Sequence, residues 1–220
     1  MDRLYRRFIQ PGDLVFDVGA HVGDRVASFR RLGARVVAIE PQPAMARVLR
    51  LLYGLSRSVA IEETAVGREQ GRARMMINVD NPTVSSFSCA FVDAARDAPG
   101  WETQRWTKSA DAAVTTLDAL IERHGRPSFI KLDVEGFEAE ALLGLSRAVP
   151  ALSFEFTTIQ RDVALACLER CSALGYTEFN SALGESQALL EDWLDAHEIA
   201  HWLKALPLAV NSGDIYARKA

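Results

Sequence analysis

The sequence predicts an α/β fold in which a parallel β-sheet carries helices on both faces, and three observations support this prediction. Short apolar runs alternate with segments of helical periodicity over residues 14–66, and the same alternation returns over residues 114–157. Such alternation is typical of a parallel sheet, because each crossover helix packs back onto one face. The length of 220 residues, with 49% hydrophobic and 25% charged residues, suits a single globular domain over residues 1–220.

The first part of the chain supplies five predicted elements in alternating order. Gly33 is placed to end the first helix, and Pro41 ends the second strand. Pro43 lies where the next helix can begin, because the first turn of a helix does not need its N–H group. We predict strands at 14–18, 35–40 and 58–66, and helices at 24–32 and 43–53.

Residues 68–113 interrupt this rhythm. Strands are predicted at 72–78 and 85–91, around a turn at residues 80–82. The polar stretch that follows has too few apolar residues for a core of its own. We therefore expect an excursion of the single domain at about residues 68–113, and not a second domain.

The alternation of strands and helices then returns. Thr116 is expected to cap one helix and Gly175 to end another. We predict helices at 117–124, 138–146 and 161–174, strands at 128–134, 151–156, 176–179 and 214–218, and helical segments between the last two strands.

Charge and apolar patterning exclude several classes of protein. The net charge of −4 and the pI near 5.6 argue against nucleic acid as the main partner. No 18 apolar residues run uninterrupted and no apolar secretory signal follows the first residues, so we expect no membrane partner. The cysteines at 89, 167 and 171 suit a reducing compartment, and a cytoplasmic protein is expected.

The loop Asp17–Gly23 lies between a predicted strand and a predicted helix, a typical place for a nucleotide-type ligand. Glycine lets the backbone approach a ligand, and a helix N-terminus offers unpaired N–H groups. A dinucleotide-binding loop needs glycine where this chain has His21, and the Gly-Lys-Ser/Thr of a phosphate-binding loop does not follow. The carboxylate of Asp17 would repel a pyrophosphate and suits a ligand with an ammonium or sulfonium group.

Glu40 ends the second predicted strand, 21 residues after Gly19. An acid at this place can accept hydrogen bonds from both hydroxyls of a ribose. A ribose without a pyrophosphate, together with an acid in the loop, indicates S-adenosylmethionine as the cofactor. The alternative is a plain strand–turn–helix in which Asp17 caps the helix.

Five motifs along the chain occur in the order found in one known family. They are Asp17–Gly23, Ile39–Pro41, Ala65–Gly67, Thr115–Asp118 and Ile130–Glu138. Together they resemble the FkbM family of S-adenosylmethionine-dependent methyltransferases, over roughly residues 11–157. The resemblance implies a Rossmann-like methyltransferase sheet of seven strands, mostly parallel with an antiparallel last strand. It also implies methyl transfer, commonly to a hydroxyl oxygen of a sugar or a secondary metabolite.

The resemblance also implies where the cofactor binds. The residues expected to contact S-adenosylmethionine are Asp17, Val18, Gly19, Ala20, His21, Gly23, Glu40, Pro41, Ala65, Val66 and Asp133. His21 stands where the family usually has Asn. Both side chains form hydrogen bonds, so we expect cofactor binding to persist, with a neutral imidazole packed in the loop.

Carboxylates near the ends of two later strands are the candidate catalytic groups. Ligands of open parallel sheets bind at the carboxyl ends of the strands, where Asp133 and Glu135 lie. A hydroxyl acceptor loses a proton as it attacks, so Asp133, or else Glu135, is predicted as the base or as the partner of the donor's amino group. Lys131 shares a side of the strand with Asp133, and a structural ion pair is the alternative. With Glu155, these acids could also ligate a divalent metal, which stays open.

Two other functions compete with methyl transfer. An NAD-dependent oxidoreductase on a related fold is disfavoured by His21 at the glycine position. A non-catalytic binding module would keep the fold without the chemistry. The expected acceptor is a small molecule or a glycan, and its identity and the oligomeric state stay open.

Overall fold

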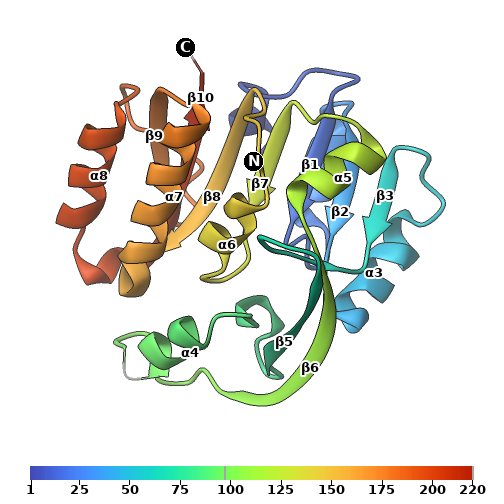
Figure 1. Ribbon diagram of the computed structural model, residues 1–220, viewed down its shortest axis with the longest axis horizontal. Coiled ribbons are helices and arrows are strands. Elements are labelled where there is room, and N and C mark those ends of the chain that lie inside the picture. The colour runs from blue at the N-terminus through green and yellow to red at the C-terminus, as the bar shows by residue number, and fades with distance from the viewer. Residues whose placement is uncertain (97, 220) are drawn as a thin grey trace.

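The computed structural model describes residues 1–96 and 98–219, and this part of the chain contains a seven-stranded main sheet. The strands lie in the order β3–β2–β1–β7–β8–β10–β9, and only the two pairs that include β10 are antiparallel. Their bounds are Leu14–Val18 (β1), Arg35–Ile39 (β2), Val59–Glu62 (β3), Phe129–Leu132 (β7), Ala151–Thr157 (β8), Glu178–Leu183 (β9) and Ser212–Arg218 (β10). The predicted mostly parallel sheet with an antiparallel last strand is confirmed (Figure 1).

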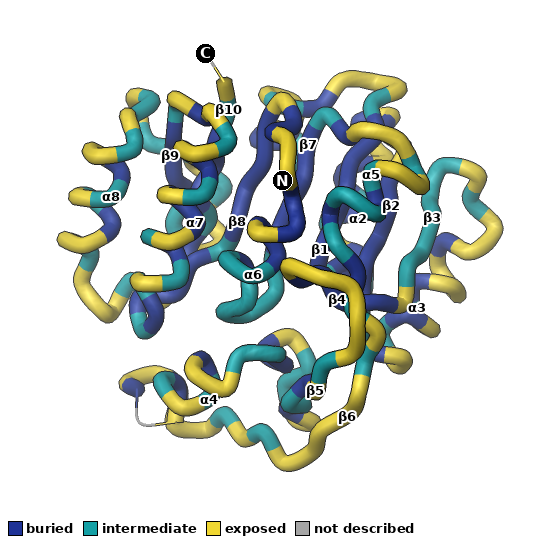
Figure 2. Tube along the Cα trace, viewed as in Figure 1, coloured by how far each residue is buried: buried dark blue, intermediate teal, exposed yellow. Residues whose placement is uncertain are grey.

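Helices cover both faces of the main sheet. One layer contains α1 Asp2–Tyr5, α2 Asp24–Arg31 and α3 Pro43–Tyr53, and the other contains α5 Leu117–His124, α6 Glu138–Leu143, α7 Arg161–Leu174 and α8 Ala196–Ala205. Neighbouring residues of a strand face opposite sides, so Val15 packs in the first layer and Phe16 in the second. Burial on both faces explains the continuous apolar runs, and Figure 2 shows these strands as the buried centre of the molecule.

Polar caps and glycines set the helix boundaries. The Thr116 hydroxyl accepts a hydrogen bond from the Ala119 N–H at 3.1 Å and starts α5. Gly175, with a left-handed φ of 89°, ends α7. Both predicted boundaries are therefore confirmed, and a cap such as Thr116 stabilises its helix by about 1 kcal/mol.

The excursion forms a second, small sheet beyond the carboxyl ends of the main strands (Figure 1). In this sheet β6 Trp106–Thr115 lies between β4 Ala65–Val66, to which it is parallel, and β5 Gly71–Asn78, to which it is antiparallel. A short 3-10 turn, η1 Pro82–Val84, and the helix α4 Cys89–Arg96 follow β5. The chain therefore passes over the carboxyl edge of the main sheet twice, along β5 and back along β6.

An apolar cluster lies beneath α4 in the excursion. The rings of Trp101 and Trp106 lie edge-on to the Phe91 ring, with centroids 5.4 and 6.1 Å from it. Phe91 is fully buried, and Val84 and Ala95 pack beside it. A few large rings thus give the excursion a small buried cluster, against which Ile159 outside the excursion also packs.

Two strand predictions differ from the structure: the one at 85–91 is wrong, and the one at 58–66 is confirmed in part. Residues 85–91 lead into α4, because the Ser88 hydroxyl accepts from the Phe91 N–H at 3.1 Å and begins a helix whose buried Phe91 and Ala95 are one turn apart. Residues 58–66 form two strands, β3 in the main sheet and β4 in the small one. β6 was not predicted, since most of its residues are exposed and show no apolar pattern.

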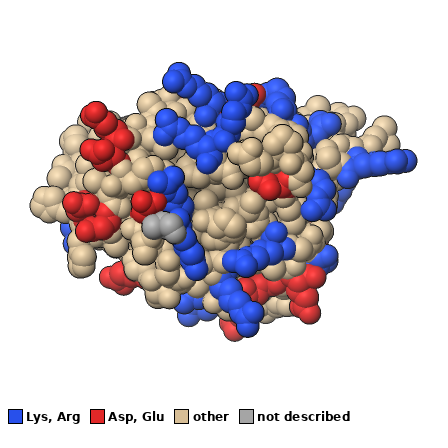
Figure 3. Space-filling view, turned by 90° about the horizontal axis from the view of Figure 1, so that it is seen from above, with Lys and Arg blue, Asp and Glu red and all other residues tan. Residues whose placement is uncertain are grey.

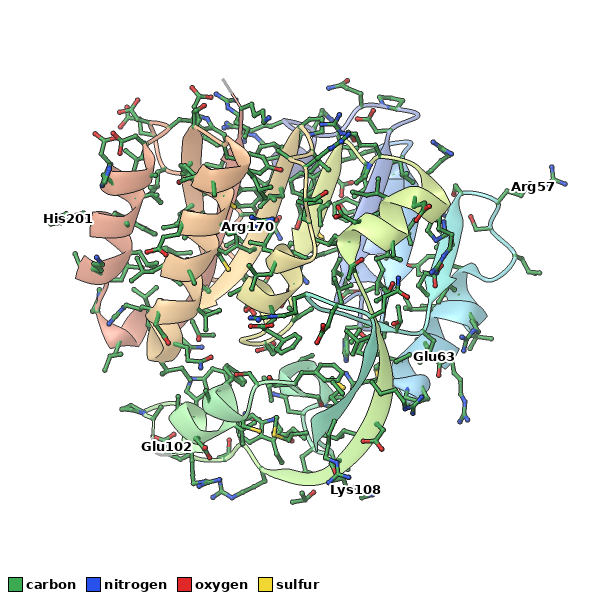
Figure 4. The ribbon with its side chains drawn as sticks, in the orientation of Figure 1. Arg57, Glu63, Glu102, Lys108, Arg170 and His201 are labelled. Atoms are coloured by element: carbon green, nitrogen blue, oxygen red, sulfur yellow. The ribbon has the colours of Figure 1, made fainter. Side chains whose placement is uncertain are left out.

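Charged side chains are distributed unevenly over the surface. Figure 3 views the end of the molecule opposite the small sheet, where Lys and Arg side chains lie along the upper and right edges and around an uncharged centre. Arg57 projects away from the body of the protein, and Lys108 projects from the small sheet (Figure 4). Within residues 1–96 and 98–219, no helix is long and apolar enough to cross a membrane.

Candidate active site

A cavity of about 340 Å³ lies at the carboxyl ends of the parallel strands. The ends of β1, β2, β7 and β8 border it on one side, and residues of the excursion border it on the other. Open parallel sheets bind their ligands at this place. Ten of the eleven residues predicted to contact the cofactor line it: Val18, Gly19, Ala20, His21, Gly23, Glu40, Pro41, Ala65, Val66 and Asp133.

Two glycines shape the loop between β1 and α2. Gly19 has a φ of 85°, and a Cβ atom there would lie 1.8 Å from the carbonyl oxygen of Asp133. Gly23 has a φ of 92°, and a Cβ atom there would lie 2.6 Å from the ring of Tyr53. Side chains are thus excluded at both positions, and the loop closes against the end of β7 and against α3. The first turn of α2, with its unpaired N–H groups, borders the cavity.

His21 connects the glycine loop to the end of β2. Its backbone is left-handed with a φ of 47°, a region in which His and Asn are more frequent than most residues. Its N–H donates to Glu40 Oε2 at 2.9 Å. Burial lowers the pKa of the imidazole, so the ring is neutral near pH 7, as expected. The buried Nε2 has no hydrogen-bond partner among the described residues and can bind a ligand.

Glu40 follows β2 and is only 2% exposed. Its two carboxylate oxygens accept from the backbone N–H groups of His21 and Gln42 at 2.9 and 2.8 Å. Burial raises the pKa of Glu40 to about 7, although these two hydrogen bonds oppose the rise. Each oxygen keeps another lone pair, so the carboxylate can also accept from a pair of ligand hydroxyls.

Asp17 is the one predicted cofactor residue that does not line the cavity. It lies in β1, beneath the glycine loop, and is 1% exposed. Neither of its carboxylate oxygens has a hydrogen-bond partner in the described part of the chain, so it does not cap α2. Burial raises the pKa of Asp17 to about 6, against the opposing charges of Arg25 and Lys131. A direct contact with a cofactor stays a prediction.

Two cations hold Asp133 at the edge of the cavity. Its Oδ2 lies 3.0 Å from the Arg25 guanidinium and 3.4 Å from the Lys131 ammonium, so the predicted ion pair with Lys131 is present. Lys131 is fully buried and also donates to Asp214 Oδ1 at 2.8 Å. Burial alone would raise the pKa of Asp133, but Lys131 and Arg25 outweigh it and hold this pKa well below its usual range.

Glu135 and Glu155 join Asp133 in an acidic group at the same end of the cavity. One carboxylate oxygen from each of the three lies within 4.8 Å of the others. Glu135 has a left-handed φ of 54°, and its carbonyl oxygen accepts from the Ser86 hydroxyl at 2.5 Å. Burial, and next the charge of Asp133, raise the pKa of both glutamates well above the usual value.

Three carboxylates this close need a cation or shared protons to offset their repulsion. Hard oxygen ligands suit a divalent metal, and the structure brings together the three acids considered for that role. A proton shared between two of these acids would also offset part of the repulsion. A divalent metal and a shared proton are therefore two alternatives at this group, and metal titration distinguishes them.

Several residues of the cavity were not predicted from the sequence. Arg25 comes from the first turn of α2, and Phe137 follows the acidic loop after β7. Both residues lie in or next to predicted motifs of the sequence, and this proximity could have indicated them as site residues. Phe87 in the excursion lies 5.8 Å from Phe137 between ring centroids, and Glu185 follows β9. These two carry no local signal, because only the fold brings them to the cavity.

The sheet order, the glycine loop after β1 and the buried acid after β2 define a Rossmann-like α/β protein with a nucleotide-type site. A family model described as the methyltransferase FkbM domain matches residues 17–203. The chain therefore belongs to the FkbM family of S-adenosylmethionine-dependent methyltransferases. Membership of this family rules out the alternative of an NAD-dependent oxidoreductase.

Solved structures with a similar fold include other methyltransferases. A protein of Pyrococcus horikoshii assigned as an RNA methyltransferase has a TM-score of 0.50 and 10% identity, covering 99% of this chain and 78% of its own. A TehB-like SAM-dependent methyltransferase from Corynebacterium glutamicum has a TM-score of 0.49 and 13% identity, with 100% and 86% covered. A precorrin-6y C5,15-methyltransferase from Geobacter metallireducens has a TM-score of 0.49 and 11% identity, with 100% and 85% covered. No protein with a curated description matches the chain. At such identities the likeness to the Pyrococcus protein concerns the fold alone.

Proposed function

We propose that this protein transfers the methyl group of S-adenosylmethionine to a hydroxyl oxygen of a sugar or a secondary metabolite. The observation that carries the proposal is one cavity that the glycine loop, Glu40, Asp133 and Glu135 line together. Donor and acceptor can meet within it. A cytoplasmic location belongs to the proposal and agrees with the three free cysteines.

The residues of the cavity fit S-adenosylmethionine. The remaining lone pairs of Glu40 suit the ribose hydroxyls, and the apolar Pro41 and Ala65 suit the face of the adenine. The first turn of α2 suits the carboxylate of the donor. Asp133 suits its ammonium group, because Arg25 and Lys131 keep the Asp133 carboxylate ionised. When bound, the cofactor supplies a methyl group on a sulfonium that leaves as a neutral thioether.

The order of the strands gives the donor an orientation. Glu40 follows β2, the glycine loop follows β1 and Asp133 follows β7, and these strands are consecutive neighbours in the sheet. A ligand that extends across them has its ribose near Glu40 and its amino-acid end near Asp133. The acceptor then lies toward β8, beside Glu135.

Methyl transfer requires alignment of the two reactants and a place for one proton. As the acceptor oxygen bonds to the methyl carbon, the carbon–sulfur bond breaks with its electron pair on sulfur, and the hydroxyl proton must leave. Asp133 has a low proton affinity because two cations hold it. Among the described residues Glu135 has no such ion pair, and burial raises its pKa; a positive donor beside it favours its ionised form. We therefore assign the proton to Glu135 and the donor's ammonium to Asp133.

The charge of the acceptor end favours a small molecule over nucleic acid. Asp133, Glu135 and Glu155 lie together there, and Glu185 adds a fourth acid to the lining. A phosphate backbone would be repelled at this end, and the net charge of −4 acts in the same direction. We propose a small-molecule or glycan acceptor.

Two measurements test this function. Calorimetry should show that S-adenosylhomocysteine binds and NAD does not. Incubation with labelled S-adenosylmethionine and a panel of hydroxyl compounds should give a product whose mass and fragmentation place the methyl group on oxygen. Donor binding without transfer to any acceptor would favour a binding module, and a methyl group on carbon or nitrogen would refute the assignment to oxygen.

A further inference from the structure

Glu155 has no role in the reaction proposed above, although its side chain lines the same cavity. It lies in β8, and β8 is the neighbour of β7 on the side away from the glycine loop. A donor that extends across β2, β1 and β7 ends at Asp133. Glu155 therefore lies on the acceptor's side of the cavity.

Both cations near the acidic end of the cavity are already in ion pairs with aspartates. Arg25 pairs with Asp133 at 3.0 Å, and Lys131 pairs with Asp214 at 2.8 Å. Among the described residues, Arg25 is the only Lys or Arg in the lining. One oxygen of Glu155 and one of Asp133 lie within 4.8 Å of each other, so without a bound cation a proton must offset their repulsion. A positively charged part of a ligand can replace that proton.

The separation of Glu135 and Glu155 allows both to bind one ammonium group. A primary ammonium has three N–H donors in a tetrahedral arrangement. With hydrogen bonds of about 2.8 Å, two of its acceptor oxygens lie about 4.6 Å apart. One oxygen of Glu135 and one of Glu155 lie within 4.8 Å of each other. The second oxygen of Glu135 remains for a neighbouring hydroxyl.

Two aromatic rings favour an organic ammonium over a metal ion. Phe87 and Phe137 both line the cavity, with ring centroids 5.8 Å apart. Phe137 is two residues after Glu135, and Phe87 adjoins Ser86, whose hydroxyl donates to the Glu135 carbonyl. Aromatic faces attract ammonium groups, whereas Mg²⁺ keeps several of its waters. The rings thus favour an organic ammonium over a metal ion, whereas carboxylates alone would suit either.

We propose, on the basis of the methyl transfer inferred above, that the acceptor is an amino sugar or amino alcohol whose ammonium is held by Glu155 and Glu135. The hydroxyl beside the ammonium receives the methyl group and gives its proton to Glu135, while the carbon–sulfur bond breaks with its electrons on sulfur. A protonated amine has no lone pair, so its nitrogen is not methylated while Glu155 holds it. Glu155 is thus a specificity-determining residue.

Probes that differ only in the amine test this inference. D-glucosamine is compared with D-glucose and N-acetyl-D-glucosamine, and 2-aminocyclohexanol with cyclohexanol. Binding is measured by calorimetry with saturating S-adenosylhomocysteine, and transfer by mass spectrometry. The charged member of each set should bind about 10- to 100-fold more tightly, as charge-assisted hydrogen bonds usually provide.

Two matched variants test whether Glu155 causes the preference for the charged probe. Glu155→Gln keeps the shape and removes the charge, so the preference should fall to less than about threefold while the affinity for S-adenosylhomocysteine is unchanged. Glu191→Gln changes an exposed acid that does not line the cavity, and the preference should persist.

Several results would overturn the inference. These are equal binding of charged and neutral probes, no binding of any amine, or a product methylated on nitrogen. A loss of S-adenosylhomocysteine affinity in Glu155→Gln would place Glu155 at the donor instead. A tight Mn²⁺ site that disappears in Glu155→Gln, without an amine preference, would assign the acids to a metal. The proposed function fails separately, if the wild-type protein does not bind S-adenosylhomocysteine at all.

Discussion

Nη2 of Arg25 lies 3.0 Å from Oδ2 of Asp133, and this ion pair joins the first turn of α2 to the end of β7. The carbonyl oxygen of the same Asp133 leaves no room for a Cβ atom at Gly19. Side chain and backbone of one residue therefore hold both ends of the glycine loop. The geometry of the donor site depends on β7 as much as on the loop itself.

Arg25→Gln should destabilise the protein and weaken donor binding together. The substitution leaves the mostly buried Asp133 with one cation fewer, so its pKa should rise toward the usual range. We expect a loss of about 2 kcal/mol in the free energy of unfolding and a lower affinity for S-adenosylhomocysteine. Chemical denaturation and calorimetry measure the two effects. The control Arg47→Gln lies on the exposed side of α3 and should change neither; equal effects of both variants would refute the role of Arg25.

The main sheet could be predicted because its strands carry their own evidence. β1 and β2 are buried on both faces, so they appear as apolar runs, and Gly19 and Glu40 lie where those runs end. β6 could not be predicted in this way, because its exposed residues are not selected for an apolar pattern. Its pairing with β5 is set by backbone hydrogen bonds, which leave little trace in the sequence.

The residues of the site also divide into those that could be predicted from the sequence and those that could not. Loop glycines, Glu40 and Asp133 follow strands that could be located, and they line the cavity as predicted. Phe87 and Glu185 come from segments whose positions depend on tertiary packing. The environment of Asp133 was also beyond prediction, because Arg25 reaches it from α2 and Asp214 reaches its partner Lys131 from β10. For this reason the sequence left two roles for Asp133 open, and the ion pairs favour one of them.

Gly19→Ala should impair both folding and donor binding. An alanine would be strained at a φ of 85°, and its Cβ would lie 1.8 Å from the Asp133 carbonyl oxygen. We expect a loss of at least about 2 kcal/mol in stability and no detectable binding of S-adenosylhomocysteine. Gly71→Ala is the control, because no atom lies within 4 Å of the added Cβ. Wild-type melting and binding in Gly19→Ala would show that the loop can move away from β7.

Donor affinity should increase with pH through the titration of Glu40. Its folded pKa of about 7 exceeds the usual 4.5, so the folded protein without donor loses stability as pH rises between these values. Ribose hydroxyls donate best to the ionised carboxylate. The affinity for S-adenosylhomocysteine should therefore rise about five- to tenfold from pH 6 to pH 8.

Glu40→Gln serves as the control for this pH dependence. The variant cannot ionise at this position, so its weaker affinity should be nearly independent of pH over the same range. Burial lowers the pKa of His21 from its usual 6.5, so its titration moves toward the acid side of this window. A pH dependence that persists in Glu40→Gln would assign it to another group, with Asp17, whose pKa is about 6, as the first to examine.

Phe91→Ala should loosen the excursion and spare the main sheet. Phe91 is fully buried against Trp101 and Trp106, and a Cβ atom on Gly136 would lie 2.8 Å from Phe91 Cβ. Loss of the ring should cost about 3–5 kcal/mol of local packing energy. Hydrogen exchange should then quicken in residues 82–106 and 135–137, with slow exchange retained in β1 and β8. Uniformly faster exchange would contradict a separate apolar cluster.

Asp133→Asn and Glu135→Gln should affect different steps, which tests the two roles assigned here. Asp133→Asn removes the anion that faces the donor's ammonium, so the affinity for S-adenosylhomocysteine should fall at least about tenfold. Glu135→Gln removes the proton acceptor, so kcat should fall about 10²- to 10⁴-fold with donor affinity within about twofold of wild type. Calorimetry and single-turnover kinetics on both variants separate the effects, and melting curves confirm that each is folded. The reverse pattern, a loss of kcat alone in Asp133→Asn, would make Asp133 the base and leave Glu135 without a role in proton transfer.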